Sequence, residues 1–285
     1  MKSIFRFVRK VLFDVVGHFS SDDGWALASH VALSGLMALF PFLIFAATLA
    51  SFMGADAFAE TAVHVIFDTW PKAIAEPIAN EVKNVLTVQR RGLLTLSVIA
   101  AAYFASNGIE ALRVALNRAY RVQDTRSIFF CRFQSLAFVI VATLGLLAIS
   151  FLLVLAPLAV RITVQKFPGM EQHIGNIDFW RYVVASGVLV IGLFAAHLWL
   201  PAGRRSILDI LPGIFMTLIA WFAGAAMFAR YLETFATYVS TYAGLASIMV
   251  AIVFLYIIAV IFILGAEINA AIKIYRDARR MKRPV

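Results

Sequence analysis

The chain has little of what soluble enzymes use. Its 285 residues include one cysteine, Cys131, so no disulfide can form within a single chain, and we expect a buried free thiol. Only 14% of the residues are charged, against about a quarter in soluble domains. It contains no P-loop, no glycine-rich dinucleotide motif, no HExxH and no GxSxG, and its five histidines lack metal-ligand spacing. These absences argue against an ATP-driven pump and a metal-dependent nuclease. We therefore expect no enzyme activity, no cofactor and no metal site.

Apolar residues, in contrast, make up 62% of the chain. A helix needs about 20 residues to cross a hydrocarbon core of about 30 Å. Six stretches approach or exceed that length, and together they predict an all-α polytopic membrane protein with a single domain, 1–285. The predicted spans are about 26–53, 92–105, 133–160, 182–200, 210–229 and 245–272. The second is the shortest, and it continues as a more polar helix to Tyr120 after a bend expected at Gly108.

Basic residues are sorted to one side of these spans. Of the 25 lysines and arginines, 17 fall at the two ends of the chain and in alternate connections, and the other eight fall on the opposite side. Positive charge marks the cytoplasmic side, so both termini are expected there, with 273–285 as a basic tail. Residues 1–20 combine apolar positions at helical spacing with Lys2, Arg6, Arg9 and Lys10, which predicts a cytoplasmic interfacial helix. We attribute the net charge of +9 to this bias and to anionic lipids, not to nucleic acid.

The longest outer connection, 54–91, contains two helical apolar patterns on either side of Pro71. They predict two short amphipathic helices on the outer face. Such helices could form a lid over a cavity or a pair that simply lies in the interface, and the sequence leaves both open.

Ionisable residues inside spans cost about 2.5–3.5 kcal/mol each, so they mark candidate sites. Glu267, toward the inner end of the sixth span, is the clearest of them, and Asn269 follows it. Its carboxylate could face a cavity and bind a cation or proton, or it could pair with a basic residue of another helix. His30 and Ser34 share a face of the first span, where they could line a polar path or form an interhelical hydrogen bond. We interpret the lone His197 as structural.

A polar stripe follows the second span, made of Glu110, Arg113, Asn117 and Arg121. One interpretation is a surface that contacts anionic headgroups or a substrate phosphate. The other is an elbow helix held by a Glu110–Arg113 pair at i, i+3 spacing.

Small residues at four-residue spacing indicate close helix packing elsewhere. The pairs are Gly192 with Ala196, Ala220 with Gly224, and Ala266 with Ala270.

Five segments together resemble the YihY/virulence factor BrkB family of inner-membrane proteins over nearly the whole chain. They are SGLMALFP at 34–41, SNGIEALRVALNRAY at 106–120, LPG at 211–213, YAGLASI at 242–248 and LGAEINA at 264–270. The resemblance implies a six-helix inner-membrane protein. Some relatives are linked to serum resistance, and others to export of lipids or lipopolysaccharide precursors. Relatives have also carried a ribonuclease BN label, which we do not extend to this chain because it lacks a metal-ligand cluster.

The combined expectation is a transporter or flippase-like protein of the bacterial inner membrane. Its substrate would be a lipid or another anionic amphipath of envelope biogenesis. Arg113, Arg118 and Arg121 would attract headgroup phosphates. Glu267 and His30 would line or gate the path. The alternative is a non-transporting scaffold for an envelope-assembly complex, and a weaker alternative is an ion channel or a small-anion exporter. The expected partners are anionic lipids, a second copy of the chain or an envelope-assembly protein.

Overall fold

The computed structural model describes residues 2–52, 93–150, 152, 174–241 and 243–281. This part of the chain forms seven α-helices and no strand, in agreement with the predicted class. They are α1 (Lys2–Ser21), α2 (Gly24–Phe52), α5 (Leu93–Ala119), α6 (Ile128–Ser150), α8 (Ile174–Trp199), α9 (Ile207–Thr241) and α10 (Ala243–Met281). The predicted outer helices of 54–91 lie outside the described residues.

Within the described residues, four helices are long and apolar enough to cross a membrane. Their spans are Ile128–Leu146, Phe179–Trp199, Ile207–Leu232 and Ile248–Ala278, in α6, α8, α9 and α10. They correspond to the third to sixth predicted spans. The first two predicted spans fall in α2, whose Gly24–Ala38 part is a shorter apolar helix, and in the more polar α5. α5 runs without interruption through Gly108, where a bend was expected.

Local sequence explains where these helices begin and end. Ser206 precedes α9, and its N–H donates to the Asp209 carboxylate at 3.3 Å, as in a capping box. Ser127 accepts a hydrogen bond from the N–H of Phe130 at 3.3 Å and caps α6. This cap starts α6 at Ile128, five residues before the predicted start of the span at 133.

Small residues let the helices approach closely. Gly108 lies on the face of α5 that meets α2, where a Cβ on this residue would lie 3.8 Å from the backbone of Ser34 and Gly35. Ala28, Ala115, Ala119 and Ala266 are buried at 0–1% exposure in the main core. The core therefore depends on alanines and glycines at helix crossings, as in other membrane bundles.

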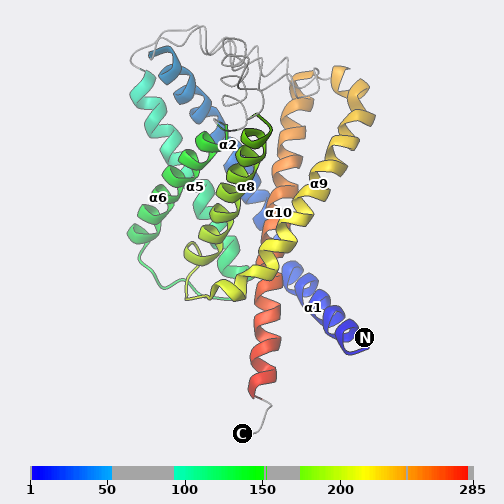
Figure 1. Cartoon of the computed structure of the whole chain (residues 1–285). Helices are drawn as coiled ribbons and strands as arrows, with labels where there is room; N and C mark the ends of the chain where they lie inside the picture. Colours follow the sequence, from blue (N-terminus) through cyan, green and yellow to red (C-terminus); the bar gives the residue numbers. More distant parts are fainter. Residues whose placement is uncertain (1, 53–92, 151, 153–173, 242, 282–285) are drawn as a thin grey trace.

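α1 and the last turns of α10 extend beyond one end of the bundle, where the α5–α6 and α8–α9 connections also lie (Figure 1). Val11 and Val15 of α1 pack there against Ala271 of α10, and the Phe7 and Tyr275 rings meet edge to face at 6.1 Å. Both ends of the described chain therefore lie at the same end of the molecule, which is called the connection end below.

Candidate functional site

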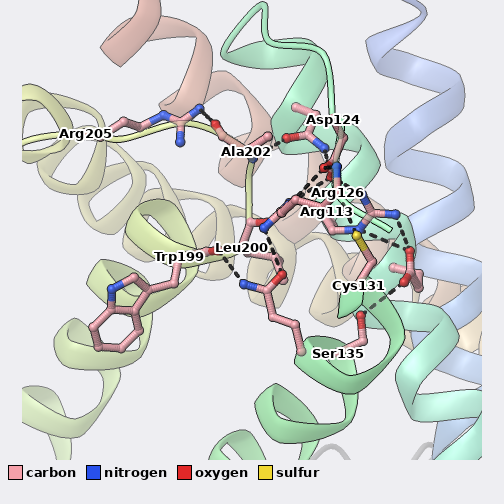
Figure 2. Close-up of polar contacts among 12 residues, drawn as sticks. Arg113, Asp124, Arg126, Cys131, Ser135, Trp199, Leu200, Ala202 and Arg205 are labelled. Atoms are coloured by element: carbon pink, nitrogen blue, oxygen red, sulfur yellow. Dashed lines mark hydrogen bonds and ion pairs between the residues drawn. The ribbon is translucent and has the colours of Figure 1, made fainter. Parts of the chain in front are cut away.

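Buried polar residues gather at the connection end, where they form three linked groups. Figure 2 shows the first group, which is centred on Asp124 in the α5–α6 connection and is called the Asp124 cluster. Arg126 donates two hydrogen bonds to the Asp124 carboxylate, from Nε to Oδ1 at 2.8 Å and from Nη2 to Oδ2 at 2.7 Å. Asn117 donates to Oδ2 at 3.0 Å, and Arg113 is also bonded to it. One carboxylate thus holds three side chains.

The Asp124 cluster also fixes the neighbouring helix ends. Arg126 donates to the carbonyl of Leu200 at 2.9 Å and to the side chain of Gln134 at 3.0 Å. Asn117 accepts a hydrogen bond from the Ala202 N–H at 2.7 Å. These bonds connect α5 and the start of α6 to the end of α8. Loop backbone that would otherwise be unpaired near the bilayer is therefore satisfied by side chains.

Glu110 and Arg113 form the predicted i, i+3 pair, with 2.5 Å between Arg113 Nη2 and Glu110 Oε2. The residues of the predicted polar stripe belong to two different groups in the structure. Glu110, Arg113 and Asn117 belong to the Asp124 cluster, whereas Arg121 points elsewhere. The cause is the end of α5 at Ala119, after which the chain turns.

The second group is a hydrogen-bond chain through Tyr120. The amide oxygen of Asn269 accepts from the Gly213 N–H at 2.6 Å, so its NH₂ group faces Tyr120 and donates to the hydroxyl at 3.1 Å. The Tyr120 hydroxyl is also hydrogen-bonded to Nδ1 of His197 at 2.7 Å. Burial raises the pKa of Tyr120, which keeps the hydroxyl protonated. This series of hydrogen bonds links the residue that follows α5 to α8, α9 and α10.

His197 is fully buried at 0% exposure and stacks on Phe262 with ring centroids 4.6 Å apart. Its contacts tie it into helix packing, which supports the interpretation of this residue as structural. The guanidinium of Arg205 lies over the Tyr120 ring, 4.0 Å from its centroid. This places a cation from the α8–α9 connection beside the second group.

The third group is called the Arg121 bridge. Nη2 of Arg121 lies 2.8 Å from Asp14 of α1 and 3.5 Å from Glu267 of α10. Glu267 is 1% exposed, and Asp14 is 19% exposed. A single cation thus serves two carboxylates from helices at opposite ends of the sequence.

The backbone at Arg121 explains how its side chain reaches both. Arg121 has φ +57°, in the left-handed region. Its N–H bonds to the Arg118 carbonyl, and the Val122 N–H bonds back to the Asn117 carbonyl, both below 3.0 Å. This is the Schellman ending of a helix, with arginine at the position where glycine is usual. Left-handed backbone costs a non-glycine residue about 1–2 kcal/mol, so the side chain compensates for a local strain.

The remaining candidates lie apart from these groups. His30 is exposed on α2, and Ser34 is half-buried near the α2–α5 contact. The structure does not bring His30 to Glu267. Among the residues that the structure describes, no group of three His, Cys, Asp or Glu side chains is placed to hold a metal ion.

The sequence analysis did not select several members of these three groups. They lie in a helix and in loops that carry no motif, and they are Asp14, Asp124, Arg126 and Arg205. Spacing alone could have indicated Asp124 and Arg126, which are two residues apart and of opposite charge. Nothing local indicates Asp14, which is 107 residues from Arg121 in the sequence.

The Asp124 cluster makes a testable prediction. Because Arg126 donates hydrogen bonds to it, the pKa of the Asp124 carboxyl lies well below its ordinary value. Its stabilisation is therefore complete above about pH 4 and is lost only as pH falls toward the folded-state pKa. Asp124→Asn should lower the free energy of unfolding by about 3 kcal/mol at neutral pH, because Arg113 and Arg126 lose a shared anion. Thermal unfolding in detergent measures the loss.

Asp23→Asn is the matched control, since Asp23 is 75% exposed and 3.6 Å from Arg118. We expect it to change stability by less than about 1 kcal/mol. The difference between the two variants should shrink as pH falls below about 4, because the unfolded chain then takes up a proton at this carboxyl while folded Asp124 is still charged. An equal effect of the two substitutions at neutral pH would contradict the central role of Asp124.

In a comparison with known proteins, the model of the family described as Virulence factor BrkB matches residues 15–285 of this chain. A protein of Bacillus subtilis (strain 168) named "Putative ribonuclease-like protein YfkH" is 28% identical over 262 residues, which cover 91% of this chain and 94% of the relative. No solved structure matches the chain.

Proposed function

The chain belongs to the virulence factor BrkB family of membrane proteins, and from this premise we propose that it is a transporter or flippase-like protein for an anionic amphipath, most plausibly a lipid. The Arg121 bridge is the observation that carries the proposal. A carboxylate buried in a membrane-spanning helix is a functional candidate by default, and here it shares its cation with a second carboxylate.

The chemistry of the bridge suits an exchange of anions. Glu267 is the weaker partner of Arg121, at 3.5 Å against 2.8 Å for Asp14. A phosphate or carboxylate headgroup could accept the guanidinium hydrogen bonds in its place, because arginine binds these groups with similar geometry. The substrate would then release α10 from Arg121 while Asp14 still holds α1. Arg205, at the same end and beside the second group, would add positive potential for the headgroup.

The proposed topology has six spans with both termini in the cytoplasm of a bacterium. α2 and α5 would supply the first two spans, with 29 and 27 residues respectively. The location of both chain ends at the connection end supports an even number of crossings. A reporter that fluoresces only in the cytoplasm, fused after residue 285, should be active, and one inserted within 54–91 should be silent.

The test of transport is lipid scrambling in proteoliposomes. A headgroup-labelled anionic lipid is quenched from outside, and the rate at which inner lipid becomes accessible is compared with protein-free vesicles. We expect faster scrambling of the anionic lipid, and a rate equal to that of empty vesicles would contradict the proposal. The Bacillus subtilis relative is named as a ribonuclease-like protein, so the same preparation is also incubated with RNA and a divalent metal. We expect the RNA to remain intact.

A scaffold for envelope assembly is the second candidate. The dense Asp124 cluster supports it, because hydrogen bonds within the chain hold the connection end in one arrangement. A scaffold would show no scrambling and would co-purify with a stable partner in amounts near one per chain.

A further inference from the structure

Only part of the apolar surface of α1 is used by the bundle. Val11, Val15 and Phe19 are buried at 7, 3 and 2% exposure against the rest of the molecule. The next strip around the helix consists of Phe5, Val8, Leu12 and Val16, at three- and four-residue spacing, with exposures of 46–72%. α1 therefore presents a second apolar strip that the described chain leaves about half or more exposed.

Arg9 lies beside this strip at helical spacing, and Arg6 and Lys10 lie further around α1. All three are exposed, on the side away from the contact with α10. An apolar strip flanked by cations is the pattern of a helix that lies in a membrane interface with its apolar side in the acyl boundary. The charges are complementary to anionic headgroups and not to the bundle itself, whose net charge is also positive.

The location of α1 in the molecule also fits contact with lipid. Ile128 and Phe129 at the start of α6 are 85 and 89% exposed, and Trp199 at the end of α8 and Leu208 at the start of α9 are 65 and 71% exposed. These side chains mark where lipid meets the connection end, because apolar residues so exposed at the ends of spanning helices need acyl chains around them. α1 begins its contact with α10 at this same end of the bundle (Figure 1).

We propose that the exposed strip of α1 and its basic border form a binding surface for anionic phospholipid, by which α1 is seated in the leaflet at the connection end. Each basic residue near an anionic surface contributes about a fivefold preference. The surface also steadies Asp14, which belongs to the same helix and faces Arg121. This proposal goes beyond transport and does not depend on it.

The test places an environment-sensitive fluorophore on α1 of the full chain. Leu12→Cys in a Cys131→Ser background gives one labelling site at the centre of the strip, and the protein is placed in nanodiscs with nitroxide-labelled acyl chains. We expect strong quenching in discs of phosphatidylcholine mixed with phosphatidylglycerol and weaker quenching in phosphatidylcholine alone. Reversal of Arg6 and Arg9 to Glu changes the charge by two units at each position, so it should lower the ratio of seated to free α1 at least about fivefold per residue in anionic discs.

Arg204→Glu is the matched control, because Arg204 is exposed in the α8–α9 connection at the same end but on another element. It should leave the quenching unchanged. Equal quenching in neutral and anionic discs, unaffected by the double reversal, would overturn the charge-dependent part of the proposal. An unquenched label in every disc would overturn it entirely and indicate a protein partner on α1. Scrambling measured in the same preparations separates these failures from failure of the transport proposal.

Discussion

Arg121→Gly should slow lipid scrambling about ten- to hundredfold while the protein remains folded. Removing the side chain deletes the cation that contacts Asp14 and Glu267, and a charge-assisted hydrogen bond of this kind contributes about 1.5–3 kcal/mol. Each 1.4 kcal/mol corresponds to about a tenfold change in rate or affinity. Glycine also fits the left-handed backbone at φ +57°, so the substitution relieves the local strain that arginine carries there.

Glu267→Gln separates a transport role from a structural one. Glutamine keeps the shape of the side chain and can still accept a hydrogen bond from Arg121, but it carries no charge. Replacing one charge of a buried pair leaves the other uncompensated, yet Arg121 keeps Asp14 as its anion. We therefore expect reduced scrambling with little loss of thermal stability. If Glu267 is only a structural partner, stability should fall and the scrambling of the folded fraction should not.

Arg204→Ala controls for the general loss of positive charge at the connection end, since this exposed arginine lies in the α8–α9 connection. It should scramble lipid at the wild-type rate. Wild-type scrambling by folded Arg121→Gly would remove the Arg121 bridge from the transport path, even if the protein proved to be a transporter.

Sequence patterns predicted the features that depend on neighbours along the chain. Apolar length identified the spanning helices α6, α8, α9 and α10, because the bilayer sets that length directly. The Glu110–Arg113 pair followed from helical spacing, and the structure confirms it. α5 continues as one helix through Gly108, where a bend was predicted, and this glycine lies in the close contact with α2.

The sequence could not predict contacts that depend on which helices meet. Glu267 was an evident candidate, but its partner Arg121 is 146 residues away and reaches it only because α5 ends in a left-handed turn. His30 was a second candidate inside a predicted span, and its side chain is exposed on α2. Periodicity places a residue on a face of its helix, and tertiary packing decides what that face meets.

Small-residue spacing shows the same limit. Gly224 does lie against α10, since a Cβ there would lie 3.2 Å from Cδ1 of Ile261, and Ala266 is fully buried. A Cβ added to Gly192, which belongs to the same pattern, would have no atom of another described residue within 4 Å. Among the described glycines, a Cβ added to Gly213 of α9 would come nearest to another atom, the carbonyl oxygen of Gly265 in α10, and no spacing rule selects this pair.

Gly213→Ala should be among the most destabilising single-methyl substitutions in the chain. A Cβ at this position would overlap the Gly265 carbonyl oxygen and lie 2.6 Å from Cγ of Asn269. Overpacking costs about 1–3 kcal/mol, and displacing Asn269 breaks buried hydrogen bonds to Gly213 and Tyr120 at about 1–3 kcal/mol more. We expect a loss of about 3–5 kcal/mol, measured by unfolding in mixed micelles. Gly192→Ala should change stability by less than about 1 kcal/mol.

Gly265→Ala offers a comparison that locates the obstacle. Its Cβ would overlap the Thr217 hydroxyl oxygen, which belongs to a side chain, and would lie 3.0 Å from the Gly213 carbonyl. Thr217→Ala should therefore restore much of the stability lost in Gly265→Ala, because it removes the overlapping atom. The same substitution should not restore Gly213→Ala, whose obstacle is backbone that truncating a side chain cannot move. Equal rescue of both variants would mean that α9 and α10 separate freely at this crossing, and the Asn269–Tyr120–His197 chain would then not depend on their close approach.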